Sequence, residues 1–596
     1  MTPPDLIPDR HAQHPSWYRE GVPVGDSPEM APLSAAAAAS AIALRSPSLV
    51  LVPVDKGRRK TLGRTERPLK MTGLTGRAGL RRKIALSTLI IGAAAFALMF
   101  MRLFFPVPVG LADNGDAYAL SCQLGIEAVL DDGVGLAWSY PVLDWRIDDS
   151  ITSANCETFP TSALALLMGA QAATAIAGEP GSVNLRALLL MYCLVASILV
   201  FALAHVIQRN LTTRIVVSAA LFVVLADGTF ANYAGSLYGE LAGVLGVPIA
   251  AIGGLLLHRS GRSQWLGLIA FAVGGVLVVG STFLATTVTF PLVIFLAVTA
   301  VAITRRNVSL KAKTRARMSN ALLATAALAL ALCLGALGSW FAITNPTEQK
   351  VTGPYHVLSF SVLGNTNDPE SVVNQLELHP GVARYVNTSV WSDPSIANEK
   401  FWPSARERIT YGTLALYFAA NPAAAWLAAN DAANAYHEAR PDYLGTFASG
   451  TDSEPQALES RAVLVSGMTS MLSNLGALPL IAVWCLMLAG AVRAIRTSHE
   501  ASVRRASGHV SILLLGVAVV QFLTVAFGDG IEMTQHMVLA ILATALTAVF
   551  LVAALLELPD PEKMVGVPVK LRSRRKPQKG GDFRAAATRN GIPSVS

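Results

Sequence analysis

The chain has 596 residues, of which 53% are hydrophobic and only 14% are charged. Soluble domains carry about 25% charged residues, so this composition excludes an ordinary soluble protein and is typical of a polytopic membrane protein. The formal net charge of +8 comes from Lys and Arg that lie between apolar runs and in both tails. Such a distribution sets membrane topology, and we expect no nucleic-acid partner.

The first predicted region is a tail of residues 1–82, rich in Pro, Ala and Arg and without a long apolar run. This composition predicts a disordered tail, and nothing in it is typical of a cleavable signal peptide. Residues 558–596 form a second, basic tail. We expect both tails to lie in the cytoplasm.

A membrane-spanning helix needs roughly 20 consecutive apolar residues, and ten runs are long enough. The sequence therefore predicts an all-α polytopic membrane protein of about ten transmembrane helices. The predicted spans are about 84–105, 186–207, 213–228, 238–257, 264–281, 284–303, 319–342, 474–496, 508–527 and 534–556.

Two long connections divide these spans into domains. A membrane domain, 83–342, contains the first outer loop, 106–185. A large outer-loop domain, 343–473, separates it from the C-terminal transmembrane helices, 474–557.

Alternate connections are basic, and positive loops stay in the cytoplasm. The strongest case is 304–318, which contains six Lys or Arg residues and no acid. We therefore expect both long loops to face outward. The apolar stretch 161–178 could be an eleventh span, but a crossing there would place every later basic loop outside. The charge pattern favours a re-entrant or interfacial helix.

Ionisable side chains lie in three separate parts of the chain that this topology brings to the outer face. Each group alone is also typical of a turn or a helix cap. Their coincidence at one depth indicates function, because charges near the hydrocarbon boundary are costly. Glu532 and His536 share a helical face if the tenth helix starts by Ile531. The outer-face residues are Asp113, Asp116, Glu240, Asp529, Glu532 and His536.

Five stretches in order resemble the bacterial integral-membrane hexosyltransferases of S-layer and cell-wall glycan biosynthesis, in the GT-C superfamily. They are "LADNGDAYALSCQLG", "NYAGSLYGELAGVLG", "YHVLSFSVLGNTNDPESVVNQLEL", "YFAANPAAAWLAANDAANAYHEARPDYLGTF" and "FGDGIEMTQHMVL". The resemblance implies an inverting transfer of a hexose from a polyprenyl-phosphate donor. The acceptor would be a cell-envelope glycan or glycolipid, and the reaction would take place on the outer face of the plasma membrane.

The resemblance also implies roles for residues. Asp116, the acid after Gly, matches the family's acidic motif and is the expected base that deprotonates the acceptor hydroxyl. Asp113 is the second choice, or a metal or acceptor ligand. Tyr118 and Tyr238 are expected to position substrate. Four residues are expected to bind the donor phosphate or a divalent metal such as Mg or Mn: Glu240, Asp529, Glu532 and His536.

One stretch departs from the family pattern. A Lys or another polar pair is expected near Thr286–Val288, where this chain has Thr-Thr-Val. A phosphate contact expected there is missing or replaced by other residues.

A multi-pass transporter or lipid-linked glycan flippase is the alternative from another class, because such proteins also have about ten spans and intramembrane charges. The clustering of the acids at one face and the single large loop without a matching half disfavour it. The chain has no Walker motif and no GxGxxG, HExxH or CxxC motif.

Two further expectations concern the outer loops. Cys122 and Cys156 both fall in the first outer loop and would form a disulfide in an oxidising compartment. In the large loop, five aromatic residues would either stack on an acceptor sugar or form the core of a folded domain, and the core is favoured. They are Tyr355, Trp391, Trp402, Tyr436 and Tyr443.

Overall fold

The computed structural model describes most of the chain between residues 72 and 557, and within that part the fold is a helical bundle with a few short strands. The predicted all-α polytopic class is confirmed. The described residues are 72–111, 117–129, 140–148, 151, 160–207, 210–259, 261–309, 314–344, 347–441, 443–448, 454, 456–498 and 502–557.

In the described residues, nine helical segments are long and apolar enough to cross a membrane. Each matches a predicted run, which makes the chain a multi-pass membrane protein. They are Lys83–Phe104 in α1 (Thr72–Phe104), α4 (Arg186–Val206), α7 (Glu240–Leu257), α8 (Arg262–Val279), Leu284–Arg305 in η4–α9 (Leu284–Val288 and Thr289–Ser309), Met318–Thr344 in α10 (Thr314–Thr344), α17 (Ala477–Arg496), α18 (Val503–Gly528) and Met533–Leu556 in α19–α20 (Met533–His536 and Val538–Leu556).

The remaining predicted span, 213–228, is a broken helix. α5 (Leu211–Ala226) is followed by α6 (Gly228–Ala231) and η3 (Asn232–Gly235), with a 52° bend between them. Asp227 makes the break because its backbone is extended, with ψ at 141°, and its carboxylate accepts a hydrogen bond from the Thr229 amide at 3.0 Å. A capping Asp at a helix start favours this arrangement.

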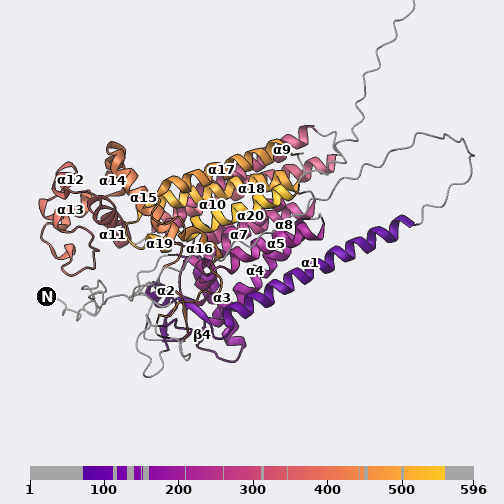
Figure 1. Ribbon diagram of the computed structural model, residues 1–596, viewed down its shortest axis with the longest axis horizontal. Helices are drawn as coiled ribbons and strands as arrows, with labels where there is room; N and C mark the ends of the chain where they lie inside the picture. Colours follow the sequence, from indigo (N-terminus) through magenta and orange to yellow (C-terminus); the bar gives the residue numbers. More distant parts are fainter. Residues whose placement is uncertain are drawn as a thin grey trace, which may run out of the picture.

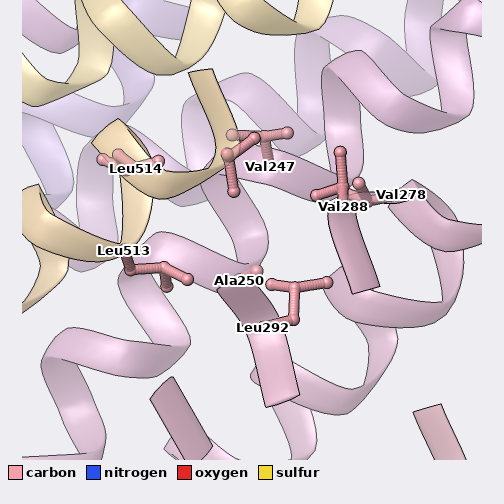
Figure 2. A pocket seen from close by; sticks show the side chains of 8 residues that line it. Val247, Ala250, Val278, Val288, Leu292, Leu513 and Leu514 are labelled. Atoms are coloured by element: carbon pink, nitrogen blue, oxygen red, sulfur yellow. The ribbon is translucent and has the colours of Figure 1, made fainter. Parts of the chain in front are cut away.

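Small residues bring the spans close together. α7 packs along α8, and a Cβ on Gly274 of α8 would collide with the backbone of Ala250 in α7. Close backbone approach of this kind is a common way for membrane helices to associate. Deeper in the bundle, Figure 2 shows apolar side chains from several helices pointing toward a small void that has no polar lining. The lining residues are Val247, Ala250, Val278, Val288, Leu292, Leu513, Leu514 and Val517.

The two long loops gather at one end of the bundle, which we call the loop end (Figure 1). From the first loop come α2 (Ala117–Leu124) and α3 (Ala163–Ile176), and α3 is too short to count as a span, as expected for 161–178. Short β-strands pair within and between the two loops. β1 (Val109–Leu111) pairs antiparallel with β5 (Leu444–Phe447), so the first loop is joined to the large loop. The other strands, β2 (Ile126–Ala128), β3 (Asp144–Ile147) and β4 (Ser182–Asn184), form one antiparallel sheet.

The large loop contains a folded domain with its own hydrophobic core. Tyr355 and Trp402 are buried in that core, as expected, and Tyr436 is buried against the spans. Trp391, by contrast, is 64% exposed. The helices of this loop are α11 (Thr347–His356), a π-helix (Val357–Leu363), α12 (Pro369–Gln375), η6 (Pro380–Arg384), η7 (Ile396–Asn398), α13 (Trp402–Arg408), α14 (Tyr411–Ala420), α15 (Pro422–Glu438) and α16 (Leu464–Ser470).

Candidate functional site

The centre of the candidate site is His536, which lies between two acids at the loop end. Its Nδ1 is 3.5 Å from a Glu240 carboxylate oxygen, and its Nε2 is 3.5 Å from an Asp529 carboxylate oxygen. The side chains of Glu240 and Asp529 are 6% and 9% exposed, and that of His536 is 22% exposed. Three residues that the sequence placed on one membrane face therefore meet.

Local structure explains how each group reaches this point. Glu240 is the first residue of α7, where a negative charge is favoured by the partial positive charge of a helix N-terminus. Asp529 follows the last residue of α18, and its Oδ1 accepts a hydrogen bond from the Ile531 amide at 3.2 Å. His536 ends the single turn of α19.

The turn between α18 and α19 differs from the expectation for Glu532. α19 begins at Met533, after Ile531, and Glu532 is its N-cap residue with φ at 54°, in the left-handed region. Glu532 and His536 therefore do not share a helical face. The Glu532 carbonyl instead accepts hydrogen bonds from the amides of Gln535 and His536. A left-handed conformation at a residue with a long side chain costs free energy, which is typical of functional segments.

Sequence reasoning missed a second layer that holds Glu240. The Gln535 Nε2 donates to Glu240 Oε1 at 3.3 Å, and the Tyr443 hydroxyl donates to Gln535 Oε1 at 2.7 Å. Gln535 is only 1% exposed. A neighbouring bond, from Thr534 Oγ1 to Glu438 Oε2 at 2.8 Å, joins α19 to the end of α15. Contacts from the large loop thus orient Glu240. In the sequence, the only sign of these contacts is the polar run Thr534–His536 that follows the acid Glu532.

The loop domain also covers the Asp529 turn. The Tyr411 hydroxyl donates to the Gly528 carbonyl at 3.1 Å, and a Cβ on Gly530 would collide with the backbone of His356. Because this cover excludes water, burial raises the pKa of Asp529 above its ordinary value, and the nearby His536 opposes that rise. Burial likewise raises the pKa of Tyr411.

The predicted acidic motif lies outside the residues that the structure describes. Asp113 and Asp116 are outside the described residues, and so is the side chain of Tyr118, whose backbone is in α2. Tyr238 is 5% exposed and lies two residues before Glu240. The assignment of Asp116 as the base therefore stays a prediction.

The remaining expectations have mixed outcomes. Cys122 is disulfide-bonded, but Cys156 is outside the described residues, so their pairing stays a prediction. The Thr-Thr-Val stretch lies in η4, where the Thr287 hydroxyl is 2.7 Å from that of Thr524. Its polar groups therefore bind the bundle.

Within the described residues there is no complete site for a divalent metal, and the expected Mg or Mn stays a prediction because Asp113 and Asp116 lie outside those residues. No group of three or more His, Cys, Asp or Glu side chains in that part of the chain is arranged to hold one.

Comparison with known proteins gives one finding. A family model described as the YfdI N-terminal transmembrane domain matches residues 76–567. Neither a search of curated proteins nor a search of solved structures found a match.

Proposed function

The chain belongs to the family of the YfdI N-terminal transmembrane domain, and we propose that it is a GT-C-type membrane glycosyltransferase. It transfers a hexose from a polyprenyl-phosphate donor to a cell-envelope glycan or glycolipid, on the outer face of the plasma membrane. The family match over most of the chain is consistent with a membrane glycosyltransferase. Donor, acceptor and membrane side are part of the proposal.

The observation that carries the proposal is the buried arrangement of Glu240, His536 and Asp529 at the loop end of the spans. A polyprenyl chain stays in the bilayer while its sugar lies at the water boundary. A site for this donor must therefore combine ionisable groups with membrane helices at one depth. The loop end has that combination.

The chemistry assigns a task to each group. The acceptor hydroxyl attacks the anomeric carbon, the bond from that carbon to the phosphate oxygen breaks, and a carboxylate takes the hydroxyl proton. We propose Asp116 as this base, with Asp113 in support. When it is protonated, His536 can stabilise the departing phosphate by its positive charge, because that phosphate gains negative charge. Glu240 and Asp529 orient the imidazole from opposite sides.

The broken helix favours the transporter alternative, but the hydrogen bonds of Asp227 argue against a substrate site there. The broken span at Asp227 is similar to the discontinuous helices that bind substrates in transporters. However, both oxygens of Asp227 accept backbone hydrogen bonds, from Thr229 at 3.0 Å and from Val465 at 2.6 Å. The carboxylate closes the helix break, and Asp227 is only 1% exposed, so it is not accessible to a substrate.

Turnover in proteoliposomes separates the two functions. The purified full chain is supplied with a polyprenyl-phosphate hexose and an acceptor extract, and the release of polyprenyl phosphate is measured. We expect release that depends on the acceptor extract. Movement of the intact donor between leaflets without any release would contradict the proposal and support a flippase.

A further inference from the structure

A second charged cluster lies at the loop end, outside the site described above. Arg102 is in the last turn of α1, and its side chain is 8% exposed. Its Nη2 forms an ion pair with Glu459 and donates to Asn232 Oδ1 at 3.0 Å. Its Nε and Nη1 are buried and have no hydrogen-bond partner, and neither does Asn232 Nδ2.

The cluster carries more positive than negative charge. Arg461 Nε pairs with the second oxygen of Glu459 at 2.8 Å, and Arg440 Nη1 donates to the Glu459 carbonyl at 2.9 Å. Among the described residues, Asp227 is the only other carboxylate that acts on Arg102 or Arg440. Three guanidinium groups thus face two carboxylates in this part of the described chain. Among the described residues, one of these positive charges therefore has no carboxylate to balance it.

The excess of positive charge in this cluster favours the binding of an anion. A buried donor without a partner is costly, and an unpaired buried charge is more so, unless a ligand or water completes it. Guanidinium groups in this setting bind phosphate well, because they stay charged and offer several donors. The cluster is therefore incomplete as a purely internal ion pair.

The position of the cluster indicates where the anion comes from. Phe105, which is 50% exposed, follows the end of the α1 span, and its carbonyl accepts a hydrogen bond from Arg461. The side chain of Arg461 is 33% exposed. The exposed part of the cluster, at Arg461, thus lies where the α1 span ends, which is the depth expected of a lipid phosphate.

We propose that Arg102, Arg440 and Arg461 form a binding site for the phosphate group of a lipid, and that Glu459 is an internal anion that competes with it. The site lies close to the candidate catalytic groups along the chain, because Arg440 precedes Tyr443, which is bonded to Gln535. If the lipid is the sugar donor, this assignment rests on the proposed glycosyl transfer and supplies the phosphate contact missing at Thr286–Val288. Phosphate binding itself does not depend on that function.

The test is a binding measurement without turnover. The full chain in detergent is titrated with farnesyl phosphate, phosphatidylglycerol or inorganic phosphate, and bound ligand is counted by native mass spectrometry. Arg102→Gln should weaken binding by at least about tenfold, the size of a lost charge-assisted hydrogen bond. Arg186→Gln is the matched control, because Arg186 also lies at the loop-end terminus of a span, at the start of α4, but is 44% exposed in its pair with Asp144.

Glu459→Gln is the second variant and has the opposite sign. Removing the competing carboxylate should strengthen phosphate binding several-fold, a result that a merely structural ion pair does not predict. Wild-type affinity in Arg102→Gln, weaker binding in Glu459→Gln, or no binding of any probe would each overturn the proposal. Tighter binding of farnesyl phosphate than of phosphatidylglycerol identifies a polyprenyl phosphate as the ligand, whereas equal binding identifies any lipid phosphate. If the wild-type chain binds lipid phosphate but transfers no hexose, the result contradicts the proposed function and leaves the phosphate site in place.

Discussion

Replacing His536 with Gln tests whether the site is held together as the structure indicates. The substitution removes the imidazole that separates Glu240 from Asp529, and these acids are 6% and 9% exposed. Two buried carboxylates would then face each other without the group between them. Both should drift toward water or bind protons.

The magnitude follows from the distances. At 3.5 Å and an effective dielectric constant of about 20, a protonated imidazole attracts each carboxylate by about 5 kcal/mol before desolvation is subtracted. Loss of one partner from a buried charged pair costs about 3–5 kcal/mol. Because 3.5 Å is longer than a normal hydrogen bond, we expect the lower end, about 3 kcal/mol.

The assay is a double-mutant cycle in detergent, with unfolding by added SDS followed by circular dichroism. His536→Gln, Glu240→Gln and the double variant are compared, and His205→Gln, at an exposed position at the end of α4, is the control. Residues in contact should couple by about 0.5–3 kcal/mol. Single effects that add within about 0.5 kcal/mol would refute the bridge.

Three further predictions concern other parts of the structure. Burial lowers the pKa of His356 from 6.5 to about 4, so as the pH falls from 6.5 to 4 the unfolded chain binds a proton at this residue that the folded chain does not. At 1.36 kcal/mol per pH unit, wild type should lose about 3 kcal/mol more stability over this range than His356→Gln. A difference in stability between the two that does not change with pH would contradict this prediction. Gly530→Ala should cost about 1–3 kcal/mol because its Cβ would meet the His356 backbone, while Gly335→Ala, where a Cβ meets nothing within 4 Å, should cost none; equal unfolding midpoints for the two variants would contradict this packing. A cysteine at Ala312 should not react with impermeant thiol reagents in intact cells, because basic loops stay in the cytoplasm. Efficient labelling would show that the membrane orientation is the opposite of the predicted one.

The spans could be predicted from sequence because each one carries its own signal. An apolar run of about 20 residues has the length of a membrane-spanning helix. The Lys and Arg residues between runs indicate which connections lie on the same side of the membrane. The break at Asp227 was the exception. A run that is short on its own gives no sign that an Asp side chain will cap a second, bent segment.

The candidate site was predictable in part. Topology placed Glu240, Asp529 and His536 on one face, but it could not show that the imidazole lies between the acids. The start of α19 at Met533 depends on a left-handed Glu532, which propensity does not favour.

The supporting contacts were not predictable at all. Tyr443 and Gln535 are 92 positions apart in the chain, and Arg102 and Glu459 are 357 apart. No local pattern pairs residues over such separations. Only the folded arrangement of the large loop against the spans identifies these partners.

The central claim is hexose transfer at the loop end with Asp116 as the base, and the rate of acceptor-dependent polyprenyl phosphate release by Asp116→Asn tests it most directly. Asparagine keeps the size of the side chain and removes its basicity. General-base catalysis contributes about 10²–10⁴-fold, so the variant should lose at least about a hundredfold in rate while it still inserts and folds. Glu370→Gln, at an exposed acid in the first turn of α12, is the control and should keep the wild-type rate. A rate near wild type for Asp116→Asn would contradict the account.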